Sequence, residues 1–139
     1  MSDRHTVFLY GTLKRGFPNH DFGRLDKFFF TDATTITRYP LLVANQWYSP
    51  VVVNEPGQGK QILGELYKVD QSTMDWMDDL EGITLPNGYR RHQTEVQCKS
   101  GEPLLAWIYT KTRDLIQQVH TGPLSDYQDQ RYIPRSARP

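Results

Sequence analysis

Short segments of alternating or continuous apolar residues, separated by turn residues, run through most of the chain. They predict strands at Thr6–Tyr10, Phe29–Tyr39, Val51–Val53, Ile62–Val69, Tyr89–Cys98 and Leu104–Lys111. Most connections between them are too short for a parallel crossover, which needs about a dozen residues. The pattern therefore favours an α+β fold, with a curled and mostly antiparallel sheet or barrel, over a doubly wound sheet.

Two segments have helical character, Pro18–Asp26 and Ser72–Leu80. For the second we expect Ser72 as the N-cap and Gly82 as the stop. At 100° per residue its apolar side chains fall on one arc and its three aspartates on the opposite side. Glu81 falls inside the apolar arc, which is an unusual place for a carboxylate.

Two interpretations of Glu81 are open. Burial and the partial negative charge of a helix C-terminus would both raise its pKa, towards the range of an acid/base catalyst. Alternatively, the helix ends before Glu81 and the side chain reaches water, since helix ends are uncertain by a residue or two.

The segment Tyr10–Gly16 carries a buried strand into a glycine turn. Such a turn can point several backbone N–H groups outward together, which suits a carboxylate or an oxyanion. The alternative is a strand-ending turn that simply exposes Lys14 and Arg15. Spacing alone does not separate these two interpretations.

Composition and charge argue against several classes of function. The chain has 139 residues, the size of one domain, and its 16 basic residues balance 16 acidic ones. Without a basic surplus we expect no nucleic-acid partner. No apolar run reaches the roughly 20 residues that cross a bilayer, and the start Met1–His5 lacks the pattern of a secretory signal. One cysteine, Cys98, cannot form an internal disulfide, so we expect a cytoplasmic protein without membrane contact.

Several common chemistries find no support in the sequence. The four histidines stand far apart, so we expect no metal site. Gly57-Gln58-Gly59 lacks the third glycine of a dinucleotide fingerprint, and Phe17-Pro18 stand where a phosphate loop needs Lys and Ser or Thr. From Thr121 onward the chain is polar and interrupted by prolines. We expect a domain at residues 1–120 and, at 121–139, an irregular tail packed on it.

The segment Thr6–His20 resembles the signature of the γ-glutamylcyclotransferase-like superfamily, and is most similar to the γ-glutamylamine cyclotransferase (AIG2-like) branch. The similarity continues through Tyr39–Leu41, Gly64–Asp70, Leu80-Glu81, Tyr89–Arg91 and Arg131–Arg135. It therefore spans nearly the whole chain. The resemblance implies a small mixed, mostly antiparallel β-barrel with short flanking helices and a cavity at one end.

The resemblance also implies an enzyme without metal or cofactor. The branch converts L-γ-glutamyl-ε-L-lysine, a remnant of transglutaminase crosslinks, into 5-oxoproline and free lysine. Carried over by motif, Tyr10, Gly11, Thr12 and Leu13 form the substrate loop and Glu81 is the catalytic acid/base. Tyr89 is a candidate supporting phenol, with a role in the core as the alternative. We expect a monomer whose partner is a small γ-glutamyl substrate.

Two alternatives accompany this expectation. The substrate class could instead be γ-glutamyl amino acids or glutathione, against which the Tyr-Gly-Thr-Leu form of the loop argues mildly. The chain could also be a non-catalytic binding domain on the same fold. The connection Gly82–Gly88 varies in length and composition in the family, so the preferred leaving amine stays open.

Overall fold

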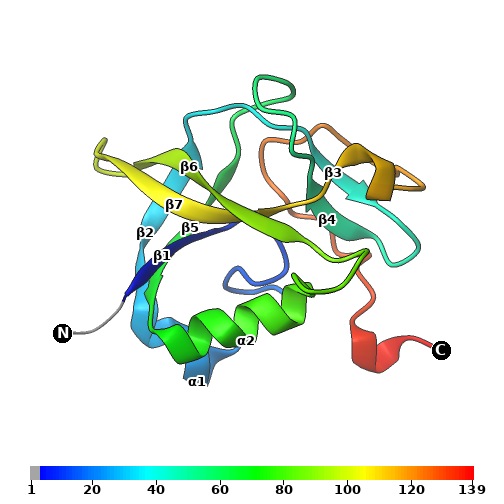
Figure 1. Ribbon diagram of the computed structural model, residues 1–139, viewed down its shortest axis with the longest axis horizontal. Coiled ribbons are helices and arrows are strands. Elements are labelled where there is room, and N and C mark those ends of the chain that lie inside the picture. The colour runs from blue at the N-terminus through cyan, green and yellow to red at the C-terminus, as the bar shows by residue number, and fades with distance from the viewer. Residues whose placement is uncertain (1–3) are drawn as a thin grey trace.

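Within residues 4–139, the part of the chain that the computed structural model describes, five strands close into a barrel in the order β1-β5-β2-β6-β7 (Figure 1). Neighbours pair antiparallel except β1 and β7, which are parallel where Val7 faces Trp107. The prediction of a small mixed, mostly antiparallel barrel is confirmed. Residues 1–3, part of the segment examined for a signal, lie outside the described residues. The barrel strands are β1 (His5–Leu9), β2 (Phe29–Thr35), β5 (Leu63–Val69), β6 (Arg90–Cys98) and β7 (Pro103–Thr110).

A second, two-stranded sheet pairs β3 (Leu41–Ala44) with β4 (Ser49–Val52). The apolar pattern predicts a strand near β4 but none at β3, whose four residues are all buried and show no alternation. It also predicts that β2 extends to Tyr39. The strand ends at Thr35 because its partner β5 begins at Leu63, opposite Thr34, and the chain then leaves the barrel.

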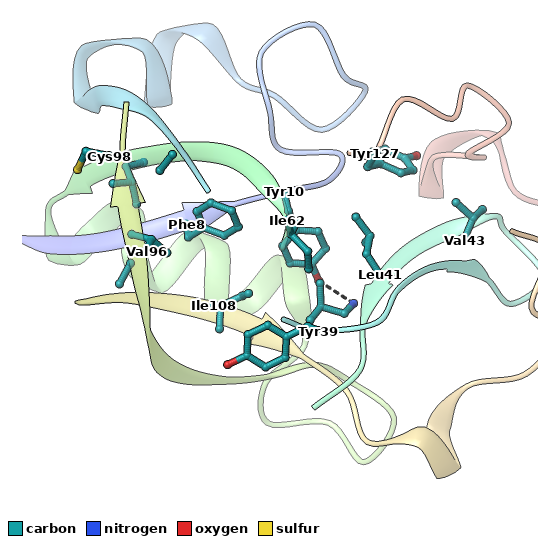
Figure 2. Packing of buried hydrophobic residues seen from close by; sticks show 14 residues of the cluster. Phe8, Tyr10, Tyr39, Leu41, Val43, Ile62, Val96, Cys98, Ile108 and Tyr127 are labelled. Carbon is teal, nitrogen blue, oxygen red and sulfur yellow. Dashed lines mark hydrogen bonds between the residues drawn. The ribbon is translucent and has the colours of Figure 1, made fainter. Parts of the chain in front are cut away.

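Strand β1 is buried on both faces. Phe8 points into the barrel interior, where Figure 2 shows it among the labelled core side chains, including Val96 and Ile108. Val7 and Leu9 point outward into a second apolar cluster beneath the helices. A strand buried on both faces reads as a continuous apolar run, which explains the segment Val7–Leu9.

Helix α2 (Gln71–Glu81) packs against the outside of the barrel through Met74 and Met77, both fully buried. Its N-cap is Asp70, whose carboxylate accepts the Thr73 N–H at 2.9 Å, so the expectation of Ser72 was wrong. Asp70 follows β5 directly and reaches the third N–H of the helix. The helix ends at Gly82, as expected, with φ 66°, a conformation that favours glycine.

The first predicted helix is shorter than expected. Helix α1 (Phe22–Leu25) begins after Asp21, whose side chain caps the Arg24 N–H, and a 3-10 turn at Asp26–Phe28 follows. The residues before Asp21 form turns instead, with Asn19 N–H bonded back to Thr12 O. No helix within residues 4–139 is long and apolar enough to cross a membrane.

The last segment lies on the barrel and the small sheet. Backbone N–H groups of Val43 and Leu124 donate to Thr121 O and Leu41 O at 2.9 and 2.8 Å. Tyr127 is fully buried in the cluster that fills the barrel end (Figure 2). Apart from a 3-10 turn at Arg135–Ala137, residues 121–139 contain no helix. The division of the chain at residue 120 stays a prediction.

Candidate active site

A pocket of about 880 Å³ lies where β1 leaves the barrel and α2 ends. Its volume falls in the upper part of the range usual for small-molecule sites, about 300–1,000 Å³. The residues singled out from the sequence, Tyr10–Leu13, Glu81 and Tyr89, all line it. The connection Gly82–Gly88, whose length varies in the family, borders it as well.

The turn after β1 is held tightly at Gly11. A Cβ atom at this position would lie 2.6 Å from Cγ of Pro50, so glycine is required for the Pro50 ring to pack against the turn. Lys14 N–H closes the turn on Gly11 O at 3.1 Å. The Asn19 side chain then bonds Thr12 Oγ1 at 2.8 Å and fixes the next residue.

Three successive backbone N–H groups of this turn, those of Gly11, Thr12 and Leu13, have no hydrogen-bond acceptor within residues 4–139. All three residues are buried and line the pocket. Buried N–H groups in proteins are nearly always paired with protein, water or ligand. The turn therefore presents a row of donors that suits an anionic oxygen in the pocket.

The basic residues of the turn are not simply exposed. Lys14 is buried, and its ammonium bonds Tyr127 O at 2.9 Å and Asp126 Oδ1 at 3.2 Å. Arg15 donates to Glu65 through both its backbone N–H and its Nε. Lys14 anchors the turn to the C-terminal segment and Arg15 anchors it to β5. The interpretation of a turn with freely exposed cations is wrong for Lys14.

Tyr10 packs in the core and directs its hydroxyl to the barrel end. The hydroxyl donates to Tyr109 O at 2.8 Å and accepts the Val52 N–H at 3.3 Å, the bond dashed in Figure 2. Burial, reinforced by the nearby Glu81 charge, raises the pKa of this phenol far above its ordinary range. Tyr10 therefore stays protonated, and its side chain serves to hold the turn in place.

Glu81 is the last residue of α2, so the helix does not end before it. Its side chain is half-buried and lines the pocket, without a hydrogen-bond partner within residues 4–139. Burial raises the pKa of this carboxyl to about 7; the positive charges of Lys111 and Arg135 oppose the rise, and Asp78 adds slightly to it. Such a group is half ionised near neutral pH and can both accept and donate a proton.

Tyr89 lies next to Glu81 because the two ends of the intervening loop, Gly82–Gly88, come close together. Its backbone N–H donates to Glu81 O at 2.9 Å, and a Cβ at Gly88 would collide with the Gly82 carbonyl. The Tyr89 hydroxyl donates to Pro50 O at 2.7 Å. Burial raises the pKa of the phenol well above its ordinary value of 10. The hydroxyl is thus bonded to the carbonyl of Pro50, the residue whose ring packs against Gly11.

Sequence reasoning missed two cations that line the pocket, Lys111 just after β7 and Arg135 in the tail. Arg135 donates to Leu80 O at 3.1 Å, one residue before Glu81. It also missed Asp78, expected on the solvent side, which accepts bonds from Arg91 and Tyr109 and fastens α2 to the barrel. Only Arg135 had a signal, since it falls within the quoted segment Arg131–Arg135.

The arrangement can bind an anionic oxygen and transfer a proton within one pocket. The N–H row suits a carboxylate or an oxyanion, and Glu81 has a pKa suited to general acid–base work at neutral pH. Within residues 4–139 no group of three or more His, Cys, Asp or Glu side chains could hold a metal ion.

Comparisons with known proteins agree with this picture. A bovine protein named γ-glutamylaminecyclotransferase is 35% identical over 142 residues, covering 95% of this chain and 83% of its own length. A putative γ-glutamylcyclotransferase of Drosophila melanogaster is 32% identical and covers 95% of this chain and 90% of its own. The crystal structure of a mouse AIG2-like protein superposes with a TM-score of 0.79 at 29% identity, over 97% of this chain and 99% of that one.

The family model for γ-glutamyl cyclotransferase, AIG2-like, matches residues 7–131, from the first barrel strand into the tail. That range contains the turn after β1, Glu81 and Tyr89. With the barrel and the pocket already described, the match places this chain in the AIG2-like γ-glutamyl cyclotransferase family.

Proposed function

We propose that this protein is a γ-glutamylamine cyclotransferase that converts L-γ-glutamyl-ε-L-lysine into 5-oxoproline and free lysine. The observation that carries the proposal is the juxtaposition, in one pocket, of a carboxyl with a pKa of about 7 and a row of unpaired backbone N–H groups. The names of the bovine and other relatives support the same activity.

The reaction is an intramolecular aminolysis. Ionised Glu81 accepts a proton from the α-ammonium group of the substrate, and the freed nitrogen attacks the γ-carbonyl carbon. A new C–N bond closes the five-membered ring while the old amide C–N bond breaks. Glu81 passes its proton to the departing ε-nitrogen. The ring nitrogen then gives up its second proton through the carboxylate to the released amine, which leaves as an ammonium ion, and ionised Glu81 is regenerated.

The turn after β1 binds the glutamyl half of the substrate. Its N–H groups donate either to the α-carboxylate or to the oxyanion that develops on the γ-carbonyl oxygen. In both cases the donors of Gly11, Thr12 and Leu13 are already oriented by the bonds of Lys14 and Asn19.

The amine and the γ-carbonyl already belong to one molecule, so intramolecularity comes from the substrate. The pocket contributes by holding the curled conformer in which the two groups are aligned. A positioned acid/base adds about 10²–10⁴-fold. The steps draw on this chain's own groups alone.

Glu81→Gln tests the proposal because it keeps the shape of the side chain and removes the base. We expect a folded protein whose rate of 5-oxoproline release falls by at least about two orders of magnitude. Near-normal turnover in the variant would remove Glu81 from the mechanism. Asp79→Asn is a matched control, since Asp79 lies two residues earlier on the exposed side of α2.

A substrate panel tests the substrate class. γ-Glutamyl-ε-lysine, γ-glutamyl-alanine and glutathione are supplied at equal concentration and 5-oxoproline is measured. Preference for the first supports the proposal, whereas preference for either of the others assigns the enzyme to that substrate class. Binding of 5-oxoproline without turnover of any of the three would indicate a non-catalytic domain.

A further inference from the structure

Lys111 and Arg135 are two basic side chains that line the pocket, and the charges of both lower the pKa of Glu81. Lys111 is half-buried, and its Nζ lies 4.6 Å from the ring centre of Tyr89. Arg135 donates one N–H to Leu80 O. Within residues 4–139 neither has a carboxylate within 4 Å, and Lys111 has no hydrogen-bond acceptor for its ammonium.

Most other cations within residues 4–139 that leave bulk water are paired with carboxylates; Arg138, which also lines the pocket, instead donates to Ile133 O at 2.9 Å. Lys14 bonds Asp126, and Arg91 bonds Asp78 through two nitrogens. This is the usual arrangement, since a cation withdrawn from water without an anion is unfavourable. Desolvation accordingly lowers the pKa of Lys111, and the charge of Glu81 only partly offsets it. Lys111 therefore has the properties of a cation that receives its anion from a ligand.

The two cations stand on the side of the pocket formed by the end of β7 and by the tail. In Figure 1 the 3-10 turn of Arg135–Ala137 lies beyond the C-terminal end of α2, where the bond to Leu80 O joins them. Arg135 is exposed and Lys111 half-buried, so they extend from the open mouth inward towards Glu81.

We propose that Lys111 and Arg135 bind a carboxylate on the leaving amine, so that the enzyme selects substrates whose departing half is an amino acid. The inference rests on the proposed function. In that function the turn after β1 and Glu81 take the carboxylate or oxyanion and the amine of the glutamyl half. When the turn takes the glutamyl α-carboxylate, the α-carboxylate of the lysine half is the anion left without a partner. Arg135 is exposed at the pocket, on the side where a departing amine can reach solvent.

A pair of substrates isolates this carboxylate. γ-Glutamyl-cadaverine is γ-glutamyl-ε-lysine with hydrogen in place of the α-carboxylate, and it keeps the distal ammonium. We expect kcat/KM for 5-oxoproline release to be at least about tenfold higher with the lysine compound, the effect of one charge-assisted hydrogen bond or more. The double variant Lys111→Met/Arg135→Gln should bring the ratio close to one, mainly through KM.

The ratio of kcat/KM for the two substrates separates carboxylate binding from a second effect of the substitution. Loss of Lys111 also changes the proton affinity of Glu81, but that change affects both substrates equally at a given pH. A wild-type ratio near one, or an unchanged ratio in the double variant, would overturn the inference. So would an equal loss on both substrates, which would assign the cations to the glutamyl half. The control is Lys99→Met/Arg38→Gln, which removes two exposed cations that do not line this pocket.

Binding measurements separate this inference from the proposed function. Calorimetric titration of Glu81→Gln with the two compounds, with and without the double substitution, reports carboxylate recognition in the absence of turnover. Carboxylate-dependent binding without 5-oxoproline release by the wild type would refute the proposed function and keep the binding site. Turnover with equal affinity for both compounds would do the reverse.

Discussion

Ionisation of Glu81 in the folded protein should make the wild type lose stability, relative to Glu81→Gln, as the pH rises. Burial raises the pKa of this carboxyl from its ordinary 4.5 to about 7. The folded chain therefore holds a proton that the unfolded chain releases near pH 4.5. The stabilising contribution is complete below pH 4.5 and is lost as the pH rises through 7.

The magnitude follows from the two pKa values. Each pKa unit corresponds to 1.36 kcal/mol, so the free energy of unfolding of the wild type should fall by about 2.5 kcal/mol relative to Glu81→Gln between pH 5 and pH 8. Glutamine has the same shape and no charge, so any fixed difference between the two proteins cancels. Other groups titrate alike in both and cancel too.

Urea unfolding at pH 5, 6, 7 and 8, followed by the fluorescence of the three tryptophans, measures this difference directly. Glu55→Gln is a control that should stay flat. The ion pair with Arg113 lowers the pKa of Glu55 below its ordinary 4.5, so its stabilising contribution is complete above pH 4.5 and the difference from the wild type should not change between pH 5 and pH 8. A Glu81→Gln difference that stays flat across the range would show that the carboxyl is fully hydrated, and would refute the reasoning about its burial.

Three further outcomes are expected. The acid limb of kcat/KM for 5-oxoproline release should lie near pH 7, and Lys111→Met should move it to higher pH because the ammonium lowers the pKa of Glu81; a pH–rate profile checks both. Gly11→Ala should reduce kcat/KM and, by urea unfolding, cost about 1–3 kcal/mol, since the new Cβ overlaps the Pro50 ring. Tyr89→Phe should cost about 0.5–1.5 kcal/mol in the same assay, because Pro50 O loses its donor.

The barrel could be predicted because the local pattern of apolar residues indicates most of its strands. Strand β1, buried on both faces, is a plain apolar run, and α2 carries the spacing that buries Met74 and Met77. Strand boundaries depend on partners instead. Strand β2 ends where β5 offers no further residue for pairing, a signal that lies in another strand. The start of α2 is local, because the Asp70 carboxylate caps the Thr73 N–H, but Asp70 and Ser72 are both residues that cap helices.

The residues of the site also divide into those that the sequence could predict and those that it could not. Glu81 stood out because a carboxylate in an apolar arc conflicts with its surroundings, and such conflicts are local. Lys111 and Arg135 show no conflict in sequence, since one follows an ordinary strand and the other lies in a polar tail. Their significance arises only when β7 and the tail are placed beside the end of α2.

The single parallel pairing in the barrel accounts for that placement. Because β1 and β7 run side by side in the same direction, the turn that follows β1 and Lys111, which follows β7, emerge at the same end. The bond from the Tyr10 hydroxyl to Tyr109 O ties these two exits together. An antiparallel β1–β7 pair would send the residues that follow the two strands to opposite ends of the barrel. Bringing the N–H row and Lys111 into one pocket therefore depends on the direction in which the barrel closes.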